Sequence, residues 1–193
     1  MKRIFSAICV AFVFVLAISA CSAPPTEEMQ RARDAVTRAE NDADAVAYAG
    51  NTVVHARDAL TRMQDEADSK NYDTAKEYAL EAINSANKAI ADGQSAKERS
   101  KAEASALLDS VQNSLAETSN AINNARSVPD IQLDFNAITQ DTDEARQIYG
   151  EAQQSFQDGN NPDAIAKGQA VRGQLADINT TINEAAFDTS RKQ

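Results

Sequence analysis

Apolar residues follow a helical period over almost the whole chain beyond Pro25, and no segment alternates as a β-strand would. The spacings predict a first helix from about Thr26 that ends at residues 49–51, where Gly50 is suited to cap its C-terminus. A second helix is expected over residues 52–69. The two apolar stripes that predict these helices are Met29, Ala32, Val36, Ala39, Ala43 and Val46, and then Val53, Ala56, Leu60, Met63 and Ala67.

The third helix is predicted to be long, from Asp73 to Ser127, which is roughly 80 Å at 1.5 Å per residue. Its first half has a stripe made of alanine: Ala75, Ala79, Ala82, Ala86 and Ala89. Residues 92–103 are polar on every face and include Gly93, where a bend could occur. A helix that is solvated all round is typical of a bridge between two packed parts.

Two further helices follow a break at Pro129, since the residue before a proline disfavours the helical conformation. One is expected over residues 134–157, and the other begins with Asn161 as N-cap and Pro162 as first helical residue. The end of the chain, residues 188–193, is expected to fray.

An internal repeat emerges when the chain is shifted by 89 residues. It superposes Ala56-Arg57 on Ala145-Arg146, Gln64 on Gln153, Asn71 on Asn160 and Ala75 on Ala164. Any two alanine-rich hairpins could align this well, so the repeat remains one of two interpretations. The predicted fold is an all-α, elongated antiparallel bundle of about five helices in two three-helix units that share the long helix, with ranges 26–92, 93–187 and 73–127.

The N-terminus has a different pattern. Lys2 and Arg3 precede an uncharged run over residues 4–20, which would reach roughly 26 Å as a helix and so falls short of a bilayer core. A short positive start, a short apolar segment and small residues before a break are typical of a cleaved secretory signal. A retained membrane span is the alternative.

The end of this segment resembles the lipobox of bacterial lipoproteins, in the residues Ile18, Ser19, Ala20 and Cys21. The resemblance implies that residues 1–20 are a signal peptide cleaved between Ala20 and Cys21. It also implies that Cys21 carries diacylglycerol and a further acyl chain such as palmitate, and two or three chains anchor a protein stably. An ordinary thiol at Cys21 is the alternative reading.

The same resemblance implies a location in the bacterial cell envelope. Ser22 follows the cysteine, where Asp would favour retention in the inner membrane, so we expect the outer membrane, with the protein facing the periplasm. Residues 21–25 would be the lipidated start and a short linker.

Charge and cysteine usage exclude several functions. The net charge of −10 becomes about −12 once Lys2 and Arg3 are removed with the signal, and such a surface repels phosphate backbones, so no nucleic-acid partner is expected. With Cys9 cleaved and Cys21 lipidated, no thiol remains for a disulfide, a metal site or a nucleophile. His55 is the only histidine, and without partners we expect it to be an exposed or boundary residue.

No other motif predicts catalysis. The sequence has several carboxylate pairs, but none belongs to a recognisable catalytic or metal-binding motif. They include Asp42 with Asp44, Asp65 with Asp68, and Asp141 with Asp143. The segment 158–163, DGNNPD, is too short for a calcium loop and lacks its later glutamate, which favours a helix cap. We therefore expect no enzyme activity, no cofactor and no metal.

The tyrosines Tyr48, Tyr72, Tyr78 and Tyr149 all lie near helix seams or interhelical turns. Packing is the simplest explanation. A peptide-binding role is the alternative, in which Tyr72 and Tyr149 would contact the partner.

A second resemblance concerns residues 49–91. They resemble a domain-of-unknown-function family of short, alanine-rich, helical envelope lipoproteins from bacteria, through Ala56, Leu60, Asn71-Tyr72, Ala75, Tyr78-Ala79, Ala82, Ala86 and Ala89. Lys70 and Asn71 depart from the family's usual Gly-Asp before Tyr72, and Met63 replaces its usual alanine. The turn is also similar to a single tetratricopeptide unit, but the 34-residue period of that repeat is absent.

The family implies an envelope location and a helical bundle, and it implies no known chemistry. We expect a non-enzymatic, lipid-anchored spacer, scaffold or interaction module with an envelope protein partner. The alternative is a tetratricopeptide-like adaptor that binds a peptide or protein within an envelope assembly complex.

Overall fold

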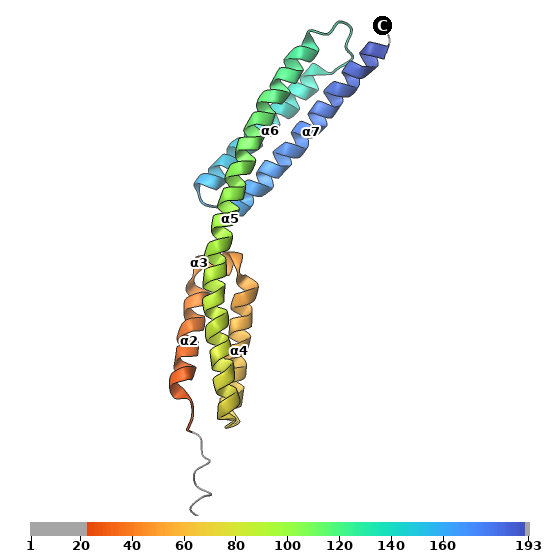
Figure 1. Ribbon diagram of the computed structural model, residues 1–193. Coiled ribbons are helices and arrows are strands. Elements are labelled where there is room, and N and C mark those ends of the chain that lie inside the picture. Colours follow the sequence, from red (N-terminus) through yellow and green to blue (C-terminus); the bar gives the residue numbers. More distant parts are fainter. Residues whose placement is uncertain (1–22, 192–193) are drawn as a thin grey trace, which may run out of the picture. The chain divides into compact units, whose positions relative to one another are not determined.

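The computed structural model describes residues 23–191, and these residues form six α-helices and no strand (Figure 1). The helices are α2 (Thr26–Asn41), α3 (Ala43–Tyr48), α4 (Gly50–Asp68), α5 (Tyr72–Arg126), α6 (Phe135–Gln157) and α7 (Asn161–Arg191). None of them has the length and apolar content needed to cross a membrane. The all-α prediction, with a long central helix, is confirmed for this part of the chain.

The chain divides into two compact units between Ala96 and Lys97, four residues beyond the predicted boundary between residues 92 and 93. The helix α5 contributes buried residues to both units. No residue from 94 to 103 is buried, as the polar sequence of this stretch predicts.

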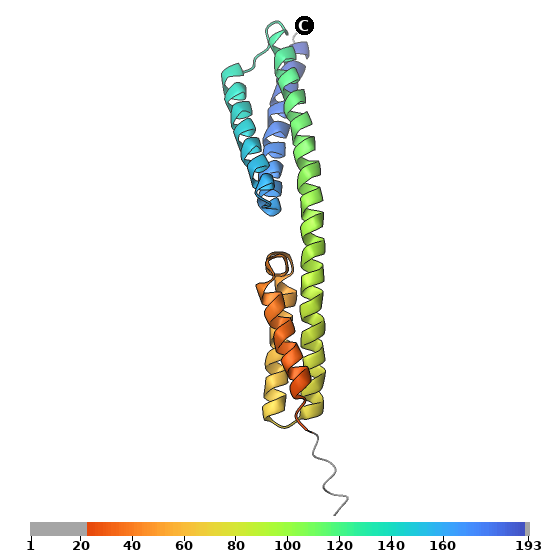
Figure 2. The ribbon, with the colours of Figure 1, turned by 90° about the vertical axis from the view of Figure 1, so that its left-hand side faces the viewer.

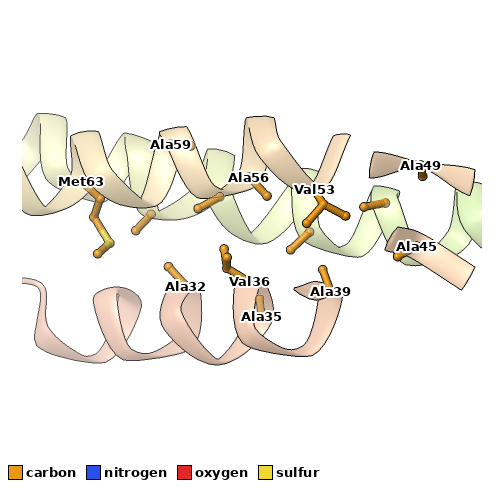
Figure 3. Close-up of a cluster of buried hydrophobic side chains, with 14 residues drawn as sticks. Ala32, Ala35, Val36, Ala39, Ala45, Ala49, Val53, Ala56, Ala59 and Met63 are labelled. Atoms are coloured by element: carbon orange, nitrogen blue, oxygen red, sulfur yellow. The ribbon is translucent and has the colours of Figure 1, made fainter. Parts of the chain in front are cut away.

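In the first unit, α2, α3 and α4 pack against the first part of α5 around a core that consists mostly of alanine (Figures 1 and 2). Ala32, Val36 and Ala39 point from α2 toward the other helices (Figure 3). The facing side of α5 is a row of fully buried alanines, here called the alanine seam: Ala75, Ala79, Ala82, Ala86 and Ala89. Because alanine has no atoms beyond Cβ, this seam allows close approach of the neighbouring helices.

Gly93 allows close approach of the helices α3 and α5. It is buried, and a Cβ at this position would lie 2.6 Å from the backbone nitrogen of Ala45 and 2.7 Å from its Cα. A hydrogen at Gly93 therefore makes room for the backbone of α3. The helix α5 continues through Gly93 as one helix, so close packing, rather than a break, explains this glycine.

The predicted first helix is wrong in one respect, because it is two helices. Asp42 interrupts it with an extended conformation, φ −82° and ψ 113°, and its side chain accepts a hydrogen bond from the Ala45 backbone N–H at 2.8 Å. A carboxylate that competes for backbone donors starts a new helix at this point. Gly50 is the first residue of α4 and not the predicted C-cap.

The second unit consists of the second part of α5 with α6 and α7, and its core holds larger side chains (Figures 1 and 2). They include Val111, Leu115, Ile122, Ile138, Val171, Leu175, Ile178 and Ile182. Asp134 caps α6 by accepting hydrogen bonds from the backbone N–H groups of Asn136 and Ala137 at 3.0 and 3.1 Å. The helix α7 runs to Arg191 and so includes residues 188–191, which the sequence predicts to fray.

The turn between α4 and α5 and the turn between α6 and α7 have the same structure at a shift of 89 residues. Lys70 and Gly159 occupy equivalent positions, with φ of 64° and 78°. Each turn has the paired backbone hydrogen bonds of a Schellman motif. In the first turn, Asn71 N–H donates to Glu66 O at 2.9 Å and Lys70 N–H donates to Ala67 O at 3.0 Å. In the second turn, Asn160 N–H donates to Ser155 O at 2.8 Å and Gly159 N–H donates to Phe156 O at 3.1 Å. This agreement supports a true repeat of the two hairpins.

Candidate functional site

The predicted lipidation and cleavage residues, Cys21 and Ala20, lie outside the described residues. The described chain begins at Ala23, and α2 begins at Thr26. The sequence remains the basis for any role of Cys21.

The two tyrosines predicted to contact a partner belong to different units. Tyr72 is the first residue of α5 and is half-buried. Tyr149 packs against the core of the second unit, and its hydroxyl accepts a hydrogen bond from Gln153 Nε2 at 3.1 Å. Burial raises the pKa of the Tyr149 hydroxyl, and the nearby Asp109 carboxylate raises it further. Tyr149 lines a groove of about 180 Å³ with Asp109 and Phe156.

His55 is exposed, as predicted, and its Nε2 lies 3.4 Å from Glu81 Oε1 on α5. Within residues 23–191, no group of three or more histidine, cysteine, aspartate or glutamate side chains is placed to hold a metal ion. Asp143, from one of the carboxylate pairs, instead forms an ion pair with Arg146 at 2.7 Å.

A polar cluster that the sequence did not reveal joins the end of α6 to the first turns of α7. Ser155 Oγ donates to Asp163 Oδ2 at 2.5 Å, and Lys167 Nζ lies 2.6 Å from the same carboxylate oxygen and 3.2 Å from Ser155 Oγ. The hydrogen bond from Lys167 lowers the pKa of Asp163, and Asp163 raises the pKa of Lys167.

This pairing bears on what Ser155 can do. A lysine activates a serine nucleophile only in its neutral form, and the raised pKa of Lys167 keeps it charged. Ser155 is also only 8% exposed. The cluster is therefore suited to holding two helices together and not to nucleophilic catalysis.

The second unit has a groove of about 340 Å³ between α6 and α7, here called the α6–α7 groove. Ile138 and Ile178, both almost fully buried, form its floor, and Leu133 adds a third apolar side chain. Three carboxylates also line it, from Asp134, Asp141 and Asp177.

The polar side chains that line this groove offer more hydrogen-bond acceptors than donors, because three of them are carboxylates. Gln174 lines the groove, and its Oε1 is buried and accepts no hydrogen bond from any described residue. Leaving a buried acceptor unpaired costs about 1–3 kcal/mol. Asp141 and Asp177 form no ion pair with any lysine or arginine among residues 23–191, whereas Asp134 is engaged in capping α6.

Comparison with known proteins bears on the first unit. Residues 27–105 match the domain of unknown function DUF4398. The match begins within α2, includes α3 and α4, and ends within α5. It is therefore longer than the segment 49–91 on which the resemblance rested, and it confirms a domain-of-unknown-function family at that coarser level. No curated protein and no solved structure matches the chain.

The α6–α7 groove and the cluster at Ser155 lie beyond the DUF4398 segment, in the second unit. Sequence reasoning did not identify either one. The groove depends on which residues of two helices face each other, and the only sequence signal was the presence of Asp141 and Asp177 on the polar sides of the two helices.

Proposed function

We propose that the protein is a non-enzymatic lipoprotein of the bacterial cell envelope, anchored through acylated Cys21 and acting as a spacer, scaffold or interaction module. The observation that carries this proposal is the cysteine directly after Ile-Ser-Ala at the end of an uncharged N-terminal run. The helix α2 begins at Thr26, so only a short linker separates the proposed anchor from the first unit. Ser22 favours the outer membrane, with the protein facing the periplasm.

Replacement of the cysteine tests the anchor. Cys21→Ala should abolish incorporation of labelled palmitate and should move the protein out of the membrane fraction. Cys9→Ala is the matched control, because Cys9 lies inside the proposed signal peptide and should not affect either result. A Cys21→Ala protein that is still labelled, or still sediments with membranes, would refute the proposal.

A second candidate function is a tetratricopeptide-like adaptor that binds a peptide or protein in an envelope complex. The α6–α7 groove favours it, because the groove combines an apolar floor with unpaired acceptors. Photocrosslinking residues at Tyr72, Tyr149 and Thr181 in intact cells would test it. A specific partner trapped at one of these positions supports the adaptor, and its absence at all three counts against it.

A further inference from the structure

We propose that the α6–α7 groove binds an arginine side chain presented by a segment of a partner protein. The inference deepens the interaction-module function proposed above by naming the chemistry of the partner. It places the aliphatic part of the arginine over the apolar floor and its guanidinium against the carboxylates at the rim.

Charge complementarity carries the first step. The Asp141 and Asp177 carboxylates line the groove, and no lysine or arginine lines it with them. A guanidinium offers five donors in a fixed plane and pairs well with carboxylates and amide oxygens. A phosphate or another anion would be repelled by the same rim, whereas a cationic ligand is attracted to it.

The apolar floor selects among cations. Ile138 and Ile178 are only 4% and 5% exposed, and together with Leu133 they present hydrocarbon to the groove. A small hydrated metal ion gains nothing from such a surface. An arginine side chain carries a three-carbon stem that can cover apolar surface while its charged end reaches the rim.

The repeat supplies an internal comparison. At a shift of 89 residues, Asp177 and Thr181 correspond to Lys88 and Asp92 of the first unit. There Lys88 Nζ pairs with Asp92 Oδ2 at 2.6 Å, so the first unit carries its own cation at this position. The second unit has Asp177 in place of that lysine and Thr181 in place of its partner, so this position carries a carboxylate and no cation of its own.

Gln174 supplies the last element. Its Oε1 is buried without a donor, and the terminal torsion of glutamine has a broad, two-fold profile, so the amide can turn toward a ligand at small cost. A guanidinium N–H in the groove would give this oxygen the partner that it lacks. The groove thus holds an acceptor whose hydrogen bond is completed on binding.

The test uses the full chain and two synthetic peptides that differ in a single side chain. One has a central arginine flanked by glycine and serine, and the other has citrulline, which keeps the shape and removes the charge. Titrations followed by NMR chemical shifts measure weak binding and also locate it. We expect the arginine peptide to shift the amide signals of residues 134–141 and 174–181 and to bind about tenfold more tightly than the citrulline peptide.

Matched variants separate the groove from general attraction to an acidic protein. Asp141→Asn with Asp177→Asn should weaken binding about tenfold, whereas Asp65→Asn with Asp68→Asn, which removes the same charge from α4, should change it less than about twofold. Gln174→Met should weaken binding while raising the melting temperature of the free protein. A purely structural role of Gln174 would change the melting temperature alone.

Several results would overturn the inference. The first two are equal weakening of arginine-peptide binding by the two double variants, and equal binding of the arginine and citrulline peptides. The others are unchanged peptide binding in Gln174→Met, and chemical-shift changes confined to residues outside the α6–α7 groove. None of them depends on lipidation, because binding is measured on the isolated chain. Failure of the groove therefore leaves the anchor test at Cys21 unaffected, and failure of the anchor leaves the groove test interpretable.

Discussion

Gly93 and Gly173 both lie inside long helices but have opposite surroundings. A Cβ at Gly93 would meet the backbone of α3, whereas a Cβ at Gly173 would meet nothing within 4 Å. Gly93→Ala should therefore lower the free energy of unfolding by about 1–2 kcal/mol, because overpacking outweighs the gain in helix propensity. Urea unfolding followed by circular dichroism measures this change.

The control for that variant is Gly173→Ala. It adds helix propensity without a clash, and we expect it to raise the free energy of unfolding by about 0.5–1 kcal/mol. If both variants stabilise the protein, the close contact between α3 and α5 is not present in solution.

The cluster of Ser155, Asp163 and Lys167 predicts a specific pH dependence. The folded protein lowers the pKa of Asp163, so its contribution to stability is present above the unfolded pKa of about 3.9 and is lost as the pH falls through the folded value. Asp163→Asn should therefore lower the melting temperature near neutral pH, and the difference from the wild type should shrink in acid. Lys167 contributes in the opposite sense, because its raised pKa makes its contribution disappear as the pH rises through the folded value.

Lys167→Met provides the matched background for this test. Without the lysine, the largest cause of the lowered Asp163 pKa is absent, so Asp163→Asn should lose much of its pH-dependent effect. An effect of Asp163→Asn that is the same at neutral and acidic pH would contradict the role given to the ion pair. Thermal unfolding at a series of pH values provides the measurement.

At the scale of the elements, the two equivalent turns make a reciprocal prediction. Lys70 adopts φ 64°, a left-handed conformation that costs a residue with a Cβ about 1 kcal/mol, and Gly159 adopts φ 78° at the equivalent position. Lys70→Gly should therefore stabilise the protein by about 1 kcal/mol, and Gly159→Lys should destabilise it by a similar amount. Equilibrium unfolding of both variants gives the two values, and changes of the same sign would show that the turns are not equivalent.

The helices could be predicted from sequence because each buries one periodic stripe. The stripe through Ala75, Ala79 and Ala82 predicts which face of the first part of α5 is buried, and the structure buries all three. The break at Asp42 was not predicted, because an aspartate between Asn41 and Ala43 is compatible with a continuous helix unless its side chain accepts a hydrogen bond from the Ala45 N–H. The α6–α7 groove also escaped prediction, since it depends on which residues of the two helices face each other.

At the scale of the whole molecule, local stability should vary along α5. Residues 94–103 include no buried residue, whereas the helix buries alanine before this stretch and larger side chains after it. Amide hydrogens of residues 98–103 should therefore exchange faster than those of residues 82–89 and 111–122, because opening there disrupts few apolar contacts. Hydrogen exchange measured by NMR tests this, and uniform protection along α5 would show that the bridge is as stable as the cores.

The difference in core side chains also has a consequence for folding. Two hairpins with the same turn compete for the same docking partners during folding, and repeated sequences are prone to mispairing. The alanine seam of the first unit lies in a core of small side chains, whereas the hairpin of α6 and α7 carries Val171, Leu175 and Ile178. Docking of that hairpin against the alanine seam would be destabilising, because poorly matched side chains either overlap or leave cavities. The size of the core side chains therefore favours docking of each hairpin in its own unit, although the backbone turns of the two hairpins are equivalent.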